Sequence, residues 1–274
     1  MAKERILITV KTYPTLSRKY GETVCTAGVR EDGSWVRIYP VPFRRLDEQE
    51  QYRKFDWVEC DLQKNANDDR PESFCPEDGS SLLRVGHIDP SSNWGVRRDI
   101  MLKRAAVYTQ LEKLITEAKT NGLSLAVFKP SKILSFKWRK EEREWSKKKL
   151  AEMRNLANQG DLFAEEAWRK TFEVIPKLPY SFSYCFQDAD GRTSNMQIFD
   201  WEIGALFWNC VRQYQDEDLA LEKVREKYED AFLKTDLHFF LGTTQLFHKR
   251  APNPWVIIGV FPIPYEMQMG LFTP

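Results

Sequence analysis

The sequence predicts a soluble α+β protein with a small N-terminal, OB-like β-barrel and a C-terminal part in which helices pack on a sheet. Three observations predict this class. Short β-rich segments separated by turn residues crowd the chain up to Leu62. Apolar residues at spacings of three and four indicate helices at 94–121 and after Asp200. Two apolar strands without alternation, 237–241 and 255–261, stand near the end of the chain, as expected for strands in the middle of a sheet.

Composition and charge set the first limits on function. The 274 residues include 41 basic and 40 acidic side chains, a net charge of +1, so bulk electrostatics do not demand a polyanionic partner. The longest apolar runs are too short to span a bilayer, and the N-terminus has charges too close to its apolar stretch for a signal peptide. We therefore expect a cytoplasmic protein with no membrane partner. The 5 cysteines form no CxxC pair, which favours buried free thiols over disulfides or a zinc site.

The clearest local structure is a β-hairpin at 23–45, whose second strand is followed by a basic segment that contains prolines. Alternating residues at 24–29 and a β-rich run at 35–39 flank a turn at 31–34 that contains Gly33.

The other elements of the first part follow in order. We expect strands at 5–11 and 55–62, a loop at 64–81, a strand at 82–88, and one helix over 94–121. The strand at 132–138 is expected to close a first domain, 1–138, after a brief strand at 123–128.

The second half begins with a charged helical segment. Residues 139–170 have few apolar positions and predict a connector to a domain at 171–274. Strands at 172–186 and 193–199 predict a second hairpin. Asp200 and Asp216 then stand where N-caps would start two helices, the first of which is apolar on most sides.

Aromatic and basic residues gather on the predicted N-terminal β-unit. Small β-barrels bind single-stranded nucleic acid with cations along the backbone and aromatic faces under the bases, and residues 1–54 hold 11 basic against 7 acidic side chains. In the alternative interpretation the aromatic residues are core and the cations are ordinary surface. The predicted binding residues here are Lys11, Tyr13, Arg18, Lys19, Tyr20, Trp35, Arg37, Tyr39, Arg44 and Arg45.

The hairpin also resembles a known group of domains. Cys25, Ala27 and Gly28, followed by Trp35 and Arg37, match the paired strands that open the OB-like barrels, called dual-OB-containing, of bacterial conflict and defence proteins. The resemblance covers 24–42. It implies a barrel fold and a nucleic-acid context, and no particular activity.

Two acidic groups are candidates for catalysis. Asp69, Arg70 and Glu72 lie in one polar loop, which could coordinate a metal or a sugar-phosphate, or could simply be solvated. Asp200 and Glu202 stand at the start of the apolar helix, where a nuclease would need carboxylates converging on Mg²⁺ and a glycosylase would need one near an oxocarbenium ion. An N-cap role explains Asp200 equally well.

Two further basic groups complete the candidate surface. His248, Lys249 and Arg250 lie between the last two strands, at a predicted loop tip suited to phosphate contacts. Lys137 and Trp138 begin a run, 137–149, of 7 cations and 3 carboxylates. The 3 histidines of the chain make no common zinc site, so no metal site is expected.

We expect from these features a nucleic-acid-binding protein, with DNA favoured over RNA, in a prokaryotic defence or genome-maintenance system that includes a protein partner. One alternative is a DNA-acting enzyme, either a metal-dependent nuclease or a base-removing glycosylase; only the nuclease would need a cofactor, Mg²⁺. Another is a protein-interaction module. The chain lacks the GxxxxGK[ST], GxGxxG, HExxH and GxSxG motifs, which argues against the enzyme classes that use them.

Overall fold

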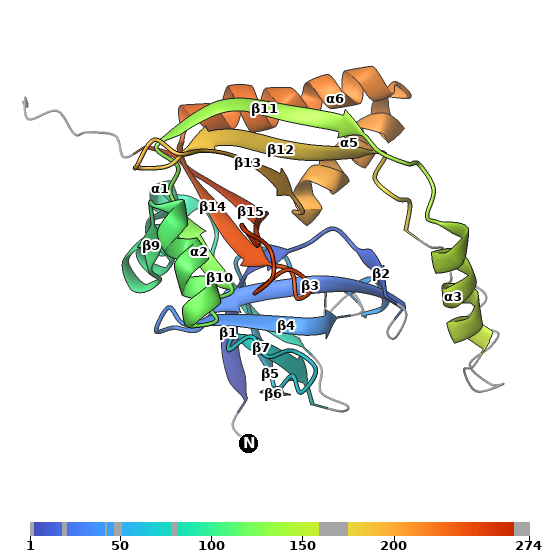
Figure 1. The fold of residues 1–274 in the computed structure, drawn as a ribbon, viewed down its shortest axis with the longest axis horizontal. Helices are drawn as coiled ribbons and strands as arrows, with labels where there is room; N and C mark the ends of the chain where they lie inside the picture. The colour runs from blue at the N-terminus through green and yellow to red at the C-terminus, as the bar shows by residue number, and fades with distance from the viewer. Residues whose placement is uncertain are drawn as a thin grey trace, which may run out of the picture.

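The chain folds as two β-sheets packed on each other, with helices on the far side of the second sheet (Figure 1). Figure 1 places the N-terminal strands in the lower part of the view and the C-terminal strands and helices in the upper part. This arrangement confirms the predicted mixed α+β class. The computed structural model describes residues 3–17, 21–41, 43–46, 51–77, 82–158 and 175–265.

The first sheet has the strand order β6-β7-β4-β3-β1-β5-β8, with β2 paired to β3. The order is open, and no described strand pair joins β6 to β8. The first part of the chain is therefore a curled half-barrel sheet in the described residues, which agrees in part with the small β-barrel that the sequence predicted. Its strands are β1 Glu4–Lys11, β2 Thr15–Ser17, β3 Gly21–Val29, β4 Trp35–Val41, β5 Asp56–Cys60, β6 Leu62–Lys64, β7 Ser73–Pro76 and β8 Leu83–His87.

The predicted hairpin at 23–45 is confirmed as β3 and β4, which pair antiparallel. Gly33 has a φ of 87° in its turn, a left-handed backbone conformation that glycine adopts without steric cost. The 3₁₀ turn η1, Phe43–Arg45, follows β4. The strand expected at 55–62 is divided into β5 and β6, and the loop expected at 64–81 contains β7.

The single helix predicted over 94–121 is wrong, because an extended stretch divides it into two helical segments. α1, Ser91–Arg98, continues into the π-helical turn η2, Asp99–Arg104, and the chain then extends into β9, Val107–Tyr108. A new helix, α2, spans Leu111–Thr120. Its start is fixed from far along the chain, because the Asp188 carboxylate accepts a hydrogen bond from the Leu111 N–H at 2.9 Å.

The second sheet is mixed, in the order β11-β12-β13-β15-β14-β10-β9. β14 and β15 lie in its middle, as their unbroken apolar sequences predicted. The strand expected to close the first domain is β11, which instead pairs with β12 in this sheet. The remaining strands are β10 Leu125–Phe128, β11 Lys132–Lys140, β12 Tyr180–Gln187, β13 Thr193–Ile198, β14 Asp236–Thr243 and β15 Trp255–Ile263.

Helices cover one face of the second sheet. Asp200 caps α5, Trp201–Tyr214, by accepting a hydrogen bond from the Glu202 N–H. Asp216 caps α6, Glu217–Arg225, so both predicted caps are confirmed. The main core joins these helices and α2 to the alternate buried residues of β12, among them Phe182. After α6 the chain forms a π-helical turn, η3 Glu226–Ala231, and a 3₁₀ turn, η4 Phe232–Lys234.

A second core joins the two sheets. Leu7 and Val10 of β1 pack with Phe240 of β14 and Phe261 of β15, all nearly or fully buried. The contact covers the face of β10, β14 and β15 that α2, α5 and α6 leave open, and residues of α1 and η2 also pack there. It does not include side chains of β11, β12 or β13 from the described residues.

The segment after β11 extends to the side of the molecule in Figure 1 and contains α3, Lys147–Asn158, which contacts the short edge strand β2. This helix agrees with the helical character predicted for the charged stretch; residues 159–174 lie outside the described residues. Within the part of the chain that the structure describes, no helix is long and apolar enough to cross a membrane.

Candidate nucleic-acid interface

One face of β11, β12 and β13 carries polar side chains and no covering layer of described elements. In β12 the aromatic residues point into the core, whereas Ser181, Ser183 and Cys185 on the opposite face are partly exposed. β13 alternates in the same way, with exposed Asn195 and Gln197. Period-two alternation is typical of a strand with one buried and one solvated face. We call this surface the open face.

Strand register arranges the open face in cross-strand rows. Lys137 pairs with Ser183, and Ser183 pairs with Gln197. In the next row, Ser135, Cys185 and Asn195 lie opposite one another. Residues that are directly opposite in neighbouring strands project from the same face of the sheet, with their Cβ atoms about 5 Å apart. Each row therefore presents several polar groups side by side.

Most of these polar groups have no hydrogen-bond or ion-pair partner among the residues that the structure describes. Among the described residues, no hydrogen bond or ion pair engages the side chains of Lys137, Ser183, Asn195 or Gln197. The exception is at the end of β11, where Arg139 donates to Glu141 at 2.7 Å and Ser181 donates to the same carboxylate oxygen at 2.9 Å. The rest of the open face is free to donate and accept hydrogen bonds.

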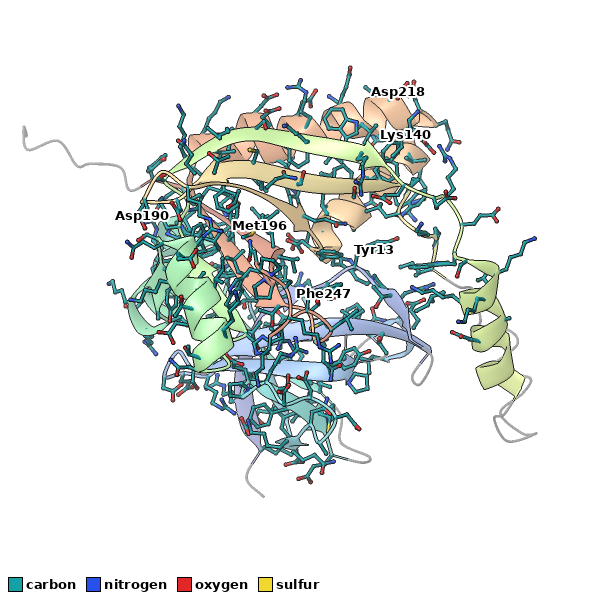
Figure 2. The ribbon with its side chains drawn as sticks, viewed as in Figure 1. Tyr13, Lys140, Asp190, Met196, Asp218 and Phe247 are labelled. Carbon is teal, nitrogen blue, oxygen red and sulfur yellow. The ribbon has the colours of Figure 1, made fainter. Side chains whose placement is uncertain are left out.

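The edge of the second sheet adds cations beside the open face. β11 is an edge strand, and its exposed residues include Lys132, Lys137 and Lys140, the last of which is labelled in Figure 2. Trp138 points to the other side of β11, where its ring lies 6.3 Å from that of Phe136, and it is 39% exposed. The predicted pair Lys137 and Trp138 thus occupies an accessible edge of the molecule.

The predicted binding residues of the hairpin do not share a surface. Trp35 packs on Phe240, with ring centroids 5.9 Å apart, in the contact between the sheets. Tyr39 is half-buried, and its hydroxyl accepts from Thr23. Arg44 is exposed but pairs with Glu22 at 2.8 Å. The alternative interpretation, in which Trp35 belongs to the core, is the one that agrees with the structure.

Arg37 is an interior residue, and not the surface cation that the sequence predicted. Its side chain is 2% exposed, and its guanidinium donates to the hydroxyl of Ser124 at 2.7 Å and to the Ser124 carbonyl at 3.0 Å. Arg18, Lys19 and Tyr20 lie outside the described residues, as does the side chain of Arg45.

Tyr13 joins the first sheet to α5, between the two halves of the molecule in Figure 2. Its ring lies against Gly204, and its hydroxyl accepts from Trp208 Nε1 and donates to the Pro176 carbonyl, both at 2.9 Å. Burial raises the pKa of Tyr13 to about 12. Tyr13 is therefore a packing residue in the described structure.

The acidic loop is also tied to the second sheet. Arg70 is buried, forms an ion pair with Asp68, and donates to the Thr243 carbonyl of β14. Burial opposes ionisation of Asp68, but hydrogen bonds from Arg70 and Ser73 outweigh it and lower the pKa of Asp68 to about 2. Arg70 therefore holds the loop in place from inside the protein.

The proposed catalytic carboxylates of this loop point to different partners. The Glu72 carboxylate accepts from the N–H of Ser124 at 3.0 Å and from its hydroxyl at 2.7 Å. Asp69 lies at the surface and pairs with Lys249 at 2.7 Å. The two carboxylates do not converge on one point.

Asp200 and Glu202 do come together, around Lys54. Asp200 is 1% exposed and accepts from Lys54 Nζ at 2.6 Å, while Glu202 lies 3.3 Å from the same nitrogen. Burial alone would lower the pKa of Lys54, but the attraction of the two carboxylates is stronger, and the pKa of Lys54 is raised. Lys54 in turn lowers the pKa of Glu202. Asp200 also accepts from the Val260 N–H, so its oxygens are used in capping and pairing.

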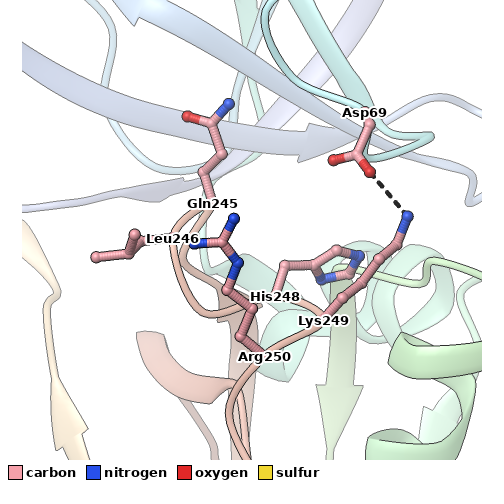
Figure 3. Close-up of a pocket in the computed structure, with 6 residues that line it drawn as sticks. All are labelled: Asp69, Gln245, Leu246, His248, Lys249 and Arg250. Carbon is pink, nitrogen blue, oxygen red and sulfur yellow. Dashed lines mark hydrogen bonds and ion pairs between the residues drawn. The ribbon is translucent and has the colours of Figure 1, made fainter.

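His248, Lys249 and Arg250 lie around a pocket of about 430 Å³ (Figure 3). His248 is 2% exposed, its Nδ1 lies 2.9 Å from the Thr243 hydroxyl, and burial lowers its pKa. Lys249 faces Asp69 across the ion pair drawn in Figure 3. Arg250 is exposed at the mouth of the pocket. The loop tip is thus accessible at Lys249 and Arg250 but not at His248.

Metal-ligating side chains do not cluster in the described residues: no group of three or more His, Cys, Asp or Glu there could hold a metal ion.

Four residues of the open face were not predicted from the sequence: Arg139, Ser183, Asn195 and Gln197. The sequence pattern that predicts this exposed face is the strict alternation of FSYCF and the polar run TSNMQ. Together they indicate a hairpin with one solvent-exposed face. The sequence does not show how far the contact between the sheets extends. That contact covers β10, β14 and β15 and leaves β11, β12 and β13 uncovered in the described residues.

Comparison with known proteins gives a family without an assigned activity. The model described as Domain of unknown function (DUF8758) matches residues 2–103, and that described as Domain of unknown function (DUF8757) matches residues 106–274, more than half of the chain. The chain belongs to the DUF8757 family. The point where one match ends and the other begins is also where the strands change from the first sheet to the second.

Other comparisons are distant. No curated protein matches the chain. A solved structure described as a murine DNA binding protein bound with ds DNA is similar with a TM-score of 0.32 and 11% sequence identity, over 95% of this chain and 94% of that chain.

Proposed function

We propose that this DUF8757 protein binds nucleic acid on the open face of β11, β12 and β13. The observation that carries the proposal is the set of unpartnered polar side chains on this face, centred on Lys137, Ser183, Asn195 and Gln197. Lysine, arginine, serine, threonine, asparagine and glutamine are the side chains that contact phosphate and sugar in protein–DNA complexes.

The composition of the open face favours nucleic acid over a protein partner. Protein interfaces depend on buried aromatic and apolar anchors at their centre. The described residues of the open face offer hydroxyls, amides and cations, with Cys185 as the least polar member. Lys132 and Lys137 of β11, which lie on this face by strand register, would contact a phosphate backbone.

The setting of this function rests on the resemblance of the hairpin to barrel domains of bacterial defence proteins. That resemblance supports an OB-like ancestry for the first sheet, a cytoplasmic protein of a prokaryotic defence or genome-maintenance system, and a protein partner in the same system. DNA is the ligand to test first, with RNA as the comparison.

The test is a binding titration with fluorescently labelled single-stranded and duplex DNA and RNA of the same sequence, at 50 and 200 mM salt. We expect the double variant Lys137→Glu, Arg139→Glu to weaken binding at least tenfold at 50 mM salt. The slope of log K against log salt should also become shallower by about 1 for each phosphate that the variant no longer neutralises.

The matched control is Lys113→Glu with Lys119→Glu. Both lysines are exposed on α2, which packs on the covered face of the sheet, and the change in net charge is the same. Equal loss of affinity in the two double variants would assign binding to overall charge and overturn the proposal. So would the absence of binding by the parent protein to any of the four ligands at 50 mM salt.

A further inference from the structure

A second pocket lies between the first sheet and the helical elements α5 and η3, where the end of β1 meets α5. It has a volume of about 440 Å³, within the range of small-molecule sites. The first sheet supplies the end of β1 and the segment before β5, and the second part of the chain supplies α5 and η3. Its lining residues are Lys11, Arg53, Lys54, Trp201, Glu202, Ala205, Leu206, Asn209 and Lys227.

Cations outnumber carboxylates in this lining. Lys11, Lys54 and Lys227, together with Arg53, face the single lining carboxylate of Glu202. The buried Asp200 beneath them is already paired with Lys54 at 2.6 Å, and Glu202 lies 3.3 Å from the same ammonium. Lys54 therefore makes the direct ion pairs with both carboxylates, and Lys227 and Lys11 attract Glu202 only from a greater distance.

Lys11 makes no direct ion pair with a carboxylate among the described residues, although Glu202 attracts it electrostatically. Its ammonium lies 3.8 Å from the ring centroid of Phe43 and 4.5 Å from that of Trp201, and no ion pair or hydrogen bond neutralises it there. Burial lowers the pKa of Lys11 to about 8; the Glu202 carboxylate acts in the opposite direction, and the Lys54 charge adds to the lowering. A largely desolvated cation gains most from a ligand that brings a negative charge to it.

The other wall of the pocket is suited to an uncharged ligand body. Trp201, Ala205 and Leu206 lie on successive turns of α5 and give an apolar strip, and Asn209 adds one amide at its end. Arg53 and Lys227 are exposed at the rim. A ligand with an anionic group at Lys11 and a less polar part along α5 would contact both walls of the pocket.

We propose that this pocket binds a phosphate ester that carries a ring, the chemistry of a nucleotide, with the phosphate at Lys11 and the rim cations and the ring along α5. Two sources offer this chemistry: a free mononucleotide and the phosphorylated end of a nucleic-acid strand. The proposal stands apart from binding at the open face, because the pocket shares no residue with that face.

Isothermal titration calorimetry with adenosine 5′-monophosphate, inorganic phosphate, and an oligonucleotide with and without a 5′-phosphate tests the proposal. We expect one mononucleotide per chain, and competition by phosphate at higher concentration. Lys11→Met, which keeps most of the apolar stem, should weaken binding at least tenfold. Arg53→Gln with Lys227→Gln should weaken it about threefold to tenfold, and these exposed residues can change without loss of the fold.

Two controls make the result specific. Lys249→Gln changes a surface lysine outside this pocket, and Lys137→Glu with Arg139→Glu changes the open face; both should bind the mononucleotide as the parent does. An affinity gain from the 5′-phosphate that Lys11→Met removes would identify a strand end as the source, and binding of the mononucleotide alone would identify a free metabolite.

Failure of all these ligands to bind at millimolar concentration would overturn the proposal. Binding that neither the Lys11 variant nor the rim variant weakens would overturn it as well.

Discussion

The guanidinium of Arg37 donates hydrogen bonds to the hydroxyl and to the backbone carbonyl of Ser124, and these bonds link the two sheets directly. Arg37 lies on β4, and Ser124 immediately precedes β10, 87 residues later. Glu72 completes the group by accepting from the Ser124 N–H and hydroxyl, while its own carbonyl accepts from the Arg37 N–H at 2.7 Å. All three residues thus satisfy one another at a site from which water is largely excluded.

Arg37→Ala should therefore destabilise the protein by about 2–4 kcal/mol, because it removes two buried hydrogen bonds to Ser124 and leaves a cavity between the sheets. Urea unfolding measures this free energy. The control is Arg44→Ala, which removes the surface pair with Glu22 and should cost no more than about 1 kcal/mol. Equal costs for the two variants would contradict the interior role of Arg37.

A second prediction compares two glycines in helices. A Cβ on Gly204 of α5 would lie 2.3 Å from the Tyr13 ring, whereas a Cβ on Gly95 of α1 would meet nothing within 4 Å. Gly95→Ala should stabilise the protein by about 0.5–1 kcal/mol through helix propensity. Gly204→Ala should instead destabilise it by about 1–3 kcal/mol, because the ring must move.

Thermal or urea unfolding of the two alanine variants provides this comparison. The double variant Tyr13→Leu, Gly204→Ala should recover part of the loss, since the clash is with the ring. Stabilisation by Gly204→Ala would show that Tyr13 does not lie against α5 in solution.

The sequence predicted most strands and both capped helices because their signals are local. Alternation, turn residues and the caps Asp200 and Asp216 lie within a few positions of the elements that they define. The break in the helix predicted over 94–121 has a distant cause: Asp188 fixes the start of α2, and β9 is held by pairing with β10. Apolar spacing cannot contain such information.

The candidate site was predictable only in part, for the same reason. Lys137 and Trp138 were expected at the surface and are there. Trp35 and Arg37 are residue types that a binding hairpin would use, yet both are buried in the contact between the sheets. Their partners there, Phe240 and Ser124, come from much later in the chain. The sequence shows which residues are polar or aromatic, and the packing of the sheets decides which of them remain exposed.

A third prediction concerns acid stability. His238 is 5% exposed, and burial, with Lys129 and Arg98 nearby, lowers its pKa to about 4. Because the unfolded chain binds a proton at the ordinary histidine pKa of about 6.5 and the folded chain does not, stability is full above that value and falls as the pH drops toward 4. The loss reaches about 3 kcal/mol at most.

His238→Asn should remove this contribution while keeping a donor for the Asp236 carbonyl, which lies 3.0 Å from Nδ1. Urea unfolding at pH 7 and pH 4.5 should show a smaller loss between the two values for the variant than for the parent. The same loss in both proteins would contradict a neutral, buried His238.

A fourth prediction tests the ion pair beneath the second pocket. Lys54→Met leaves the Asp200 carboxylate buried without its cation, so unfolding free energy should fall by about 3–5 kcal/mol. Asp200→Asn in the same chain removes the uncompensated charge and should restore part of this loss. A double-mutant cycle gives the coupling energy, and additive costs of the two changes would contradict the pairing.

The last prediction places a negative charge in the middle of the open face. Ser183 lies between Lys137 and Gln197 in one cross-strand row. In Ser183→Glu the new carboxylate would stand next to the free Lys137 ammonium and compete with a phosphate for it. Nucleic-acid affinity at 50 mM salt should fall about fivefold to tenfold, and the salt slope should become shallower by about 1.

Thr116→Glu is the matched control, because Thr116 is exposed on α2, on the covered side of the second sheet. The two variants have the same net charge, so a general loss of electrostatic attraction would weaken both equally. Screening acts on both in the same way as salt rises from 50 to 200 mM, and only a contact between Lys137 and phosphate predicts different slopes. Equal affinities and equal slopes would therefore remove Ser183 and its row from the binding surface, whereas a selective loss in Ser183→Glu would locate the phosphate backbone along β11 and β12.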